Sequence, residues 1–277
     1  MAEKHGVQLL SLFGEEYPPL LKAIPDPPPV LYVKGVLGEA LRCVACVGTR
    51  SPSLFGRTVS QRLTRVLAEN GWTVVSGLAI GVDAISHQAA LDAGGRTVAV
   101  LANGLDSVYP SENQALARRI LDQGGALVSE QPFGARASAR CLVQRDRIQS
   151  GMSLAVFAMQ TDIKGGTMHT VRFALQQGRT VFVPAPPPGY SSEEKSRGIR
   201  ALAERTGREL PEILAAAPDY ARLLRGRFAA QPPAIALRGR EEYPDVLARL
   251  GEAASGWPRP REGLRAASQS LEPSTRG

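Results

Sequence analysis

Short apolar runs alternate with longer helical stretches along the middle of the chain. Three runs have the length and the β-branched content of buried strands: RCVACVG, WTVVSG and RTVAVLANG, which begin at Arg42, Trp72 and Arg96. The stretches between them, GRTVSQRLTRVLAENG and AIGVDAISHQAALDAG, have the length of helices. This strand–helix–strand order predicts a parallel sheet that is covered by helices on both faces.

The alternation continues to residue 188, with the predicted strands ALVSE, SLAVFAM and RTVFVP and the predicted helices NQALARRILDQG and TMHTVRFALQQG. Residues 134–151, GARASARCLVQRDRIQSG, are predicted as a long loop and a turn. A glycine follows each predicted helix, where a left-handed residue ends the last turn, at Gly71, Gly94, Gly124 and Gly178. The fold class expected for residues 42–188 is therefore α/β, with a Rossmann-like, doubly wound and mostly parallel sheet.

The two ends of the chain have a different pattern. Residues 1–41 contain YPPLL, PDPPP and VLYVKG, which predict a short N-terminal cap segment with a proline-rich turn and one edge strand. After the proline run PAPPPG, residues 189–255 hold two helical patterns and are expected to form a small helical C-terminal appendage. Residues 256–277 are rich in Arg, Ser, Pro and Gly, so a disordered tail is expected there.

Composition bears on the compartment and on the class of partner. The sequence has neither an apolar run of about 20 residues, as a membrane span requires, nor a signal peptide, so a cytoplasmic protein is expected. Cys43 and Cys46 form a C-x-x-C, but no second Cys or His pair lies nearby, which favours a buried strand over a zinc or redox site. No metal and no cofactor are expected. The net charge of +7 indicates an anionic partner such as nucleic acid.

In an open parallel sheet, ligands bind beyond the carboxyl ends of the strands, so the loops after the predicted strands are the candidate site. The first loop contains Gly48, Thr49, Arg50 and Ser51 and opens a helix, where unpaired N–H groups and the helix dipole favour an anion. The Arg50 guanidinium can bind phosphate through two parallel hydrogen bonds. These residues predict a phosphate site.

The second loop, SGLAIGVD, also consists mainly of small residues. Gly77 and Gly81 would let a ligand approach the backbone, although the loop is not the G-x-G-x-x-G fingerprint of NAD-binding proteins. Asp83 and His87 are four residues apart on one helical face and could form a hydrogen-bonded pair. The alternative, which is favoured, is that Asp83 stabilises the helix start while His87 packs in the interior.

The strongest phosphate pattern is Lys164-Gly165-Gly166-Thr167 at the start of a predicted helix, which combines a cation, two exposed backbone amides and a hydroxyl. It is not a P-loop, because G-x-x-x-x-G-K-[ST] does not match. The basic pair Arg145 and Arg147 is predicted to lie in a loop at the same edge of the sheet. Two such loops and a basic pair indicate several phosphates, hence a polynucleotide or a dinucleotide.

Taken together, the motifs CVGTRSPSLFG, VVSGLAIGVDAISHQAAL, TVAVLANGLDSVYPSEN, GGALVSE, RDRI and GGTMHTVRFALQQGRTVFVP resemble the DprA/Smf family of DNA-processing proteins. The resemblance covers residues 17–188 in unbroken order. It implies a Rossmann-like domain that binds single-stranded DNA, protects it from nucleases and helps to load the RecA recombinase, commonly as a homodimer. It implies no catalysis, and it places DNA phosphates at Arg50, Arg145, Arg147 and Lys164 to Thr167.

The chain departs from the family pattern at several positions. Asp146 stands where the family usually has Asn between two arginines, Cys141-Leu142-Val143 replaces Asn-Phe-Pro, Ile80 replaces an arginine, and Gln160-Thr161 replaces an acidic residue. These changes indicate a divergent member of the family.

Two other functions remain open from the sequence. The wider superfamily that the DprA/Smf family resembles includes N-glycosidic hydrolases, which need a carboxylate beside a phosphate site, and Glu130, Asp146 and Asp83 are the candidate catalytic residues. An anti-phage DNA glycosylase would belong to this class. Alternatively, the same loops could hold a nucleotide signal without turnover.

Overall fold

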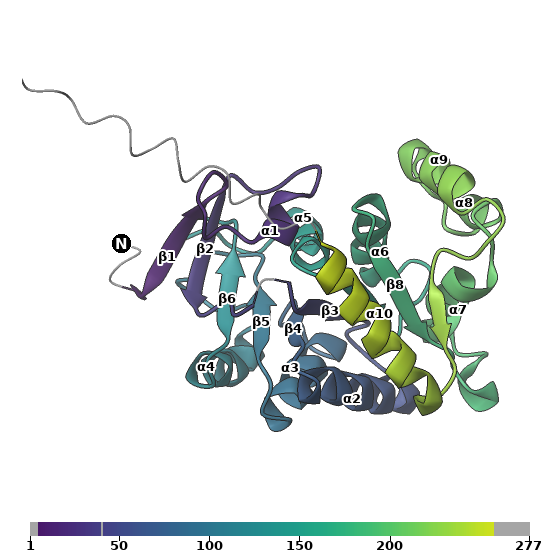
Figure 1. Ribbon diagram of the computed structural model, residues 1–277, viewed down its shortest axis with the longest axis horizontal. Coiled ribbons are helices and arrows are strands. Elements are labelled where there is room, and N and C mark those ends of the chain that lie inside the picture. Colours follow the sequence, from purple (N-terminus) through teal and green to yellow (C-terminus); the bar gives the residue numbers. More distant parts are fainter. Residues whose placement is uncertain (1–4, 40, 258–277) are drawn as a thin grey trace, which may run out of the picture.

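A computed structural model describes residues 5–39 and 41–257, which form one mixed α/β unit. Its centre is a nine-stranded sheet with the order β1-β2-β6-β5-β4-β3-β7-β8-β9 (Figure 1). Six of the strands are the parallel strands that the sequence predicts: β3 (Cys43–Val47), β4 (Thr73–Ser76), β5 (Thr97–Val100), β6 (Ala126–Ser129), β7 (Ala155–Ala158) and β8 (Thr180–Pro184). The predicted α/β fold class is confirmed.

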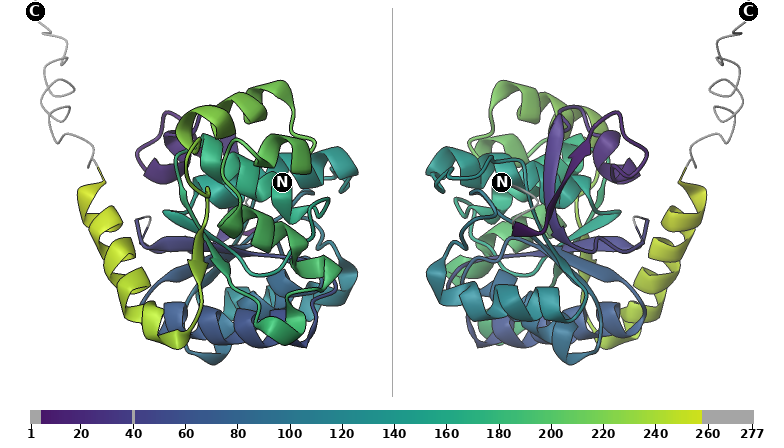
Figure 2. Two further views of the ribbon diagram at one scale, coloured as in Figure 1. Left: turned by 90° about the vertical axis from the view of Figure 1, so that its right-hand side faces the viewer. Right: turned by 90° about the vertical axis from the view of Figure 1, so that its left-hand side faces the viewer.

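Helices cover both faces of the sheet, as expected for strands whose residues are buried on both sides (Figure 2). One face packs against α2 (Leu54–Glu69), α3 (Val82–Asp92) and α4 (Gln114–Asp122). The other packs against α1 (Pro19–Lys22), α5 (Ala139–Gly151) and α6 (Thr167–Gln176). Successive strand residues alternate between the faces, so Cys43 and Cys46 enter different core clusters and cannot share a metal ion.

Glycines end the helices where the sequence predicts. Gly71, Gly94, Gly124 and Gly178 have φ values of +76°, +71°, +76° and +75°, the left-handed conformation that glycine adopts without steric cost. These stops determine where each strand begins, and therefore which residues reach the carboxyl edge of the sheet.

The N-terminal segment contributes more to the sheet than the sequence predicts. The predicted edge strand VLYVKG is β2 (Val30–Gly35), and its prediction as an edge strand is wrong, because it pairs antiparallel with strands on both sides, β1 and β6. The edge is formed by β1 (Val7–Ser11), a strand that the sequence does not predict. Tyr17 fixes the proline-rich turn between β1 and β2 by donating its hydroxyl hydrogen to the Pro28 carbonyl oxygen at 2.7 Å. The cap is thus continuous with the central sheet.

The C-terminal part is mainly helical, with α7 (Arg197–Glu204), α8 (Leu210–Ile213), α9 (Pro218–Arg227) and α10 (Tyr243–Gly256). It also supplies one strand that the sequence does not predict, β9 (Ile235–Leu237), which pairs parallel with β8. Short 3-10 turns at 111–113, 188–190, 194–196 and 240–242 join the larger elements. Helix α10 packs on the same face as α2, and the tail predicted for residues 256–277 lies outside the described residues from position 258.

The prediction that residues 139–151 form a loop and a turn is wrong, because these residues form helix α5. Ser138 caps the helix by accepting a hydrogen bond from the Cys141 backbone N–H at 3.2 Å. The helix escapes sequence analysis because two arginines, Arg145 and Arg147, occupy buried positions where apolar residues would mark an amphipathic helix. No helix in the described part of the chain is long and apolar enough to cross a bilayer.

Candidate nucleic-acid interface

The strand order creates a switch point at β3. Strand β4 lies on one side of β3 and β7 on the other, so the loops after β3 and β7 leave the sheet in diverging directions. In doubly wound sheets the crevice at such a point is the usual place of a ligand. The loops that the sequence analysis singled out lie here.

A cavity of about 520 Å³ opens at this edge, and we call it the central cavity. The loop Gly48–Arg50 lines one side and the loop Gly165–Thr167 another, so the two loops converge as predicted. Helix α5 forms a further wall with Leu142, Val143 and Asp146. Arg50 is exposed, as are Ser51 and Lys164 beside the lining residues.

Two glycines of the predicted site, Gly48 and Gly81, serve the packing of one loop on another. Gly81 has a φ of +86°, and a Cβ there would lie 2.5 Å from the carbonyl oxygens of Thr49 and Arg50. A Cβ on Gly48 would lie 2.6 Å from the Val82 side chain. The Val82 N–H donates to the Thr49 oxygen at 3.1 Å, so the two glycines let the loop after β4 support the Arg50 loop.

The loop before α6 has the open backbone that anion binding requires. A Cβ on Gly166 would meet no atom within 4 Å, and Gly166 makes no side-chain cap to the helix. In the first turn of α6 the N–H groups of Met168 and His169 donate to the Gly165 and Gly166 oxygens, which leaves those of Gly166 and Thr167 available next to the exposed Lys164. Lys195, which also lines the cavity and is exposed, comes from a segment with no motif, so sequence analysis did not find it.

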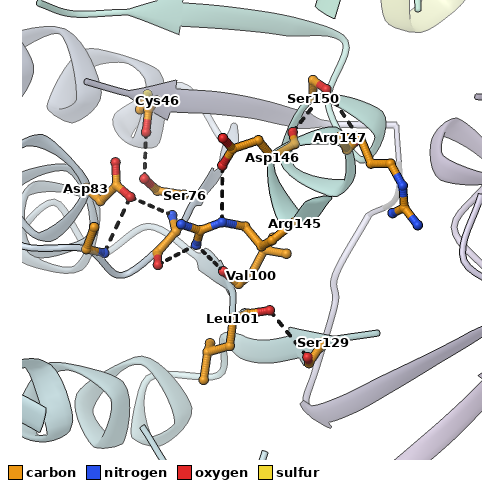
Figure 3. A network of polar contacts seen from close by, with 12 residues as sticks. Cys46, Ser76, Asp83, Val100, Leu101, Ser129, Arg145, Asp146, Arg147 and Ser150 are labelled. Carbon is orange, nitrogen blue, oxygen red and sulfur yellow. Dashed lines mark hydrogen bonds and ion pairs between the residues drawn. The ribbon is translucent and has the colours of Figure 1, made fainter. Parts of the chain in front are cut away.

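Arg145 is buried, and its guanidinium serves the interior of the protein. It donates to the carbonyl oxygens of Gly77 at 2.6 Å and Val100 at 2.5 Å, and its Nε lies 3.2 Å from Asp146 (Figure 3). A Cβ on Gly77 would clash with this guanidinium at 2.1 Å, which explains the glycine. The expectation that Arg145 lies on a loop open to phosphate is therefore wrong. Gly77 lies beneath the Arg145 guanidinium.

Arg147 points away from Arg145 and is also buried (Figure 3). It forms ion pairs with Glu130 at 2.6 Å and with Asp26 at 3.1 Å, so it joins α5 to the end of β6 and to the N-terminal cap. Neither Arg147 nor Glu130 lines the central cavity. The prediction that Arg147 lies in a phosphate-facing loop is therefore wrong. Glu130, a candidate catalytic carboxylate in the sequence, lies outside the central cavity.

Asp83 and His87 do not bond to each other in the structure. Asp83 accepts hydrogen bonds from the N–H groups of Gly77 at 3.2 Å and Ala79 at 3.4 Å, so it orders the loop before α3. The His87 Nδ1 lies 2.6 Å from the Thr97 hydroxyl, and burial lowers the pKa of His87 to about 3. The favoured interpretation, a helix-start carboxylate and a packed histidine, agrees with these contacts.

Asp146 is a buried carboxylate of the central cavity whose titration is strongly perturbed. Burial raises its pKa to about 7, although the Arg145 guanidinium acts in the opposite direction. Asp83, whose pKa is also raised by burial, adds to the rise. The floor of the cavity therefore changes charge near neutral pH, while its rim carries the cations Arg50 and Lys195.

Gln160 occupies one of the positions where the family pattern has an acidic residue, and it is buried. Its Oε1 accepts from the Ser53 N–H at 3.0 Å, and its Nε2 donates to Glu193 and Ser196, both at 3.0 Å. The amide thus ties the start of α2 to the segment that carries Lys195. Among the described residues, no group of three or more His, Cys, Asp or Glu side chains is arranged to hold a metal ion.

Comparisons with known proteins agree with this architecture. The chain is 38% identical to DNA processing protein DprA of Bacillus subtilis over 76% of this chain and 73% of that protein. It is 40% identical to protein Smf of Escherichia coli over 69% of this chain, and the match spans 52% of that longer protein.

Two solved structures share the fold. The X-ray structure of DNA processing protein A from Streptococcus pneumoniae is 30% identical, with a TM-score of 0.61 over 73% of this chain and 76% of that one. DNA processing protein A from Helicobacter pylori, whose structure concerns its single-stranded DNA binding mode, has a TM-score of 0.68 at 24% identity, over 89% of this chain and 96% of that one. The family model described as DNA recombination-mediator protein A matches residues 8–217. With the switch-point cavity, the sheet order and these matches, the chain belongs to the DNA recombination-mediator protein A family.

Proposed function

We propose that this protein binds single-stranded DNA and holds the phosphate backbone in the central cavity. The observation that carries the proposal is the convergence of Gly48–Arg50 with Gly165–Thr167 at the switch point of the sheet. The relative from Helicobacter pylori is described by its single-stranded DNA binding mode, and the Bacillus subtilis relative as a DNA processing protein.

The phosphate contacts in this proposal come from the rim of the cavity. Arg50 and Lys195 are exposed cations, and the backbone amides at Gly166 and Thr167 lie at the open start of α6. Arg145 is buried and donates to the Gly77 and Val100 carbonyl oxygens, so it positions the floor instead of contacting DNA. Phosphate contacts of this kind give affinity with little sequence preference and release counterions on binding.

Fluorescence anisotropy with a labelled oligothymidylate tests the proposal. Arg50→Ala is expected to weaken binding about tenfold and to lower the slope of log affinity against log salt by about 1, because one charge-assisted phosphate contact is lost. Arg222→Ala, which removes an exposed cation from α9 outside the cavity, is the matched control. Equal affinities for the parent and Arg50→Ala, or an affinity independent of salt, would contradict the proposal.

A second candidate function rests on the two carboxylates of the central cavity. Asp83 and Asp146 line it, and a carboxyl group that titrates near neutral pH is suited to general acid–base work on an N-glycosidic bond. Chromatography of nucleotides and of modified DNA after incubation would detect a released base. Release that disappears in Asp146→Asn would replace the binding-only proposal with a hydrolase. A nucleotide that copurifies with the protein and competes with DNA would instead indicate a sensor.

We extend the proposal to partners. The family model that the chain matches is described as DNA recombination-mediator protein A, so RecA recombinase is the proposed protein partner. A homodimer in the cytoplasm is the proposed assembly. Light scattering of the purified protein and RecA loading on DNA coated with a single-strand binding protein test these two points.

A further inference from the structure

A second cavity lies at the same edge of the sheet, beside the last two strands. It has a volume of about 630 Å³ and opens beyond the paired strand ends Pro184 and Leu237 of β8 and β9. The first half of α2 forms one wall and the start of α10, at Tyr243, forms another. We call it the lateral cavity. Carboxyl ends of parallel strands favour ligand binding here for the same topological reason as in the central cavity.

The lining of the lateral cavity combines aromatic rings with cations. Phe55 and Tyr190 pack with their ring centroids 5.9 Å apart, and Tyr243 adds a third ring. The charged lining residues are Arg62, Arg238 and Arg240, and no carboxylate of the described chain is among them.

Among the described residues, Arg238 is the one cation of this lining that forms an ion pair, although the Glu241 carboxylate also lies close to Gly239 of the lining. Arg238 lies 3.8 Å from Glu242 and its side chain is 75% exposed, so this pair is weak and open to water. Flat apolar walls beside unneutralised guanidinium groups suit a ligand that is both planar and anionic, and a nucleotide has this chemistry.

The two cavities are neighbours along two segments of the chain. Arg50 lines the central cavity, and Phe55 at the start of α2 lines the lateral one. In the other segment, Tyr190 lines the lateral cavity and Lys195 the central one. Strand β3, whose end lines the central cavity, lies three strand spacings from β9, whose end lines the lateral one, so the two cavities lie within about 14 Å of each other at the usual distance between strands. A single strand a few nucleotides long can therefore reach from one to the other.

We propose that the lateral cavity is a base-binding subsite for the DNA strand whose phosphates lie in the central cavity. Phe55, Tyr190 and Tyr243 stack on bases there, and Arg62, Arg238 and Arg240 bind the flanking phosphates. The subsite rests on the proposed function. Its wall from Leu237 to Tyr243 lies beyond residues 8–217, which match the family model, so the subsite is built partly from residues outside that match.

Photocrosslinking locates the bases directly. Oligothymidylates that carry 5-iodouracil at one position each are bound to the full chain, irradiated and mapped by mass spectrometry of the peptides. Adducts on Phe55, Tyr190 or Tyr243, limited to one or two positions of the strand, are the expected result. Adducts found only on residues outside the lateral cavity overturn the proposal.

Affinity as a function of oligonucleotide length provides the second test. The double variant Arg238→Ala/Arg240→Ala changes exposed residues and is expected to weaken binding of a long oligonucleotide about fivefold or more, with no change for one that fills only the central cavity. The double variant Arg222→Ala/Arg225→Ala removes two exposed cations from α9 and is the control, which keeps the parent's affinity at every length.

The outcomes separate this inference from the proposed function. If Arg50→Ala weakens binding but Arg238→Ala/Arg240→Ala matches the control at every length, the subsite is overturned while the central site stands. If the parent binds no oligonucleotide, both proposals fail. Thymidine monophosphate that binds the lateral cavity without competing with the oligonucleotide also overturns a subsite shared by one strand.

Discussion

Replacement of Arg145 distinguishes a buried structural arginine from a phosphate ligand. Its side chain is 7% exposed and satisfies two carbonyl oxygens and the Asp146 carboxylate at once. Arg145→Ala leaves all three acceptors without this partner in a buried place. Removal of one member of a buried ion pair typically costs about 3–5 kcal/mol of unfolding free energy. Since native proteins are stable by about 5–15 kcal/mol, the variant is expected to be marginally folded at 25 °C.

Urea unfolding followed by circular dichroism measures the effect. Arg145→Lys keeps the charge but cannot contact three acceptors with a planar fork, so an intermediate loss of stability is expected. The double variant Arg145→Met/Asp146→Leu removes both charges and is expected to recover stability relative to Arg145→Ala. Arg50→Ala, on the surface, should lie within about 0.5 kcal/mol of the parent.

The reasoning would be refuted by the opposite pattern. If Arg145→Ala is within about 1 kcal/mol of the parent and loses as much DNA affinity as Arg50→Ala, then Arg145 is available to phosphate. The sequence-based expectation for this arginine would then be right and its structural role secondary.

Three further predictions concern the same edge of the sheet. Burial raises the pKa of Asp146 to about 7, so between about pH 4 and pH 7 the folded state binds more protons than the unfolded state, and stability falls as pH rises through this window. Asp146→Asn should flatten both this slope and the loss of DNA affinity that accompanies ionisation of the carboxyl group. A parent protein that gains stability from pH 5 to pH 7 relative to Asp146→Asn would count against this prediction. Burial lowers the pKa of His87 to about 3, so the unfolded state binds more protons below pH 6.5 and stability is lost as pH falls from there toward 3. Unfolding measured at pH 7 and pH 5 should show a smaller loss of stability for His87→Gln than for the parent. Gly81→Ala forces a Cβ to within 2.5 Å of two backbone oxygens at φ +86°, so it is expected to lower the unfolding free energy by more than about 1 kcal/mol and to weaken DNA binding. Gly166→Ala, with open space around its Cβ, should leave the melting temperature unchanged. Equal melting temperatures for the two variants would show that the loop contact at Gly81 is dispensable.

The element order and the fold class follow from local signals in the sequence. The apolar runs at residues 43–47 and 155–158 are buried strands because a short β-branched run between helices has few other stable places. The helix ends follow from glycine, whose lack of a Cβ admits positive φ without regard to distant contacts. The central location of the two phosphate loops also follows, because parallel strands in a doubly wound sheet bring their carboxyl ends to one edge.

The direction of individual charged side chains depends on the tertiary structure. Arg145 and Arg147 resemble solvent-facing cations in the sequence, yet α5 turns one toward Gly77, 68 residues away in the chain, and the other toward Asp26, 121 residues away. The same applies to Glu130, whose ion pair with Arg147 holds its carboxylate outside the central cavity.

Only long-range packing brings in the residues that the sequence analysis missed. Lys195 reaches the central cavity because the buried amide of Gln160 holds the segment around Ser196 against the start of α2. Strand β9 is only three residues long and joins the sheet because β8 offers it a free parallel edge. Local sequence thus determined which elements form and where they end, whereas burial in the assembled sheet decided which charges remain free to meet a ligand, since burial depends on neighbours that lie far away in the chain.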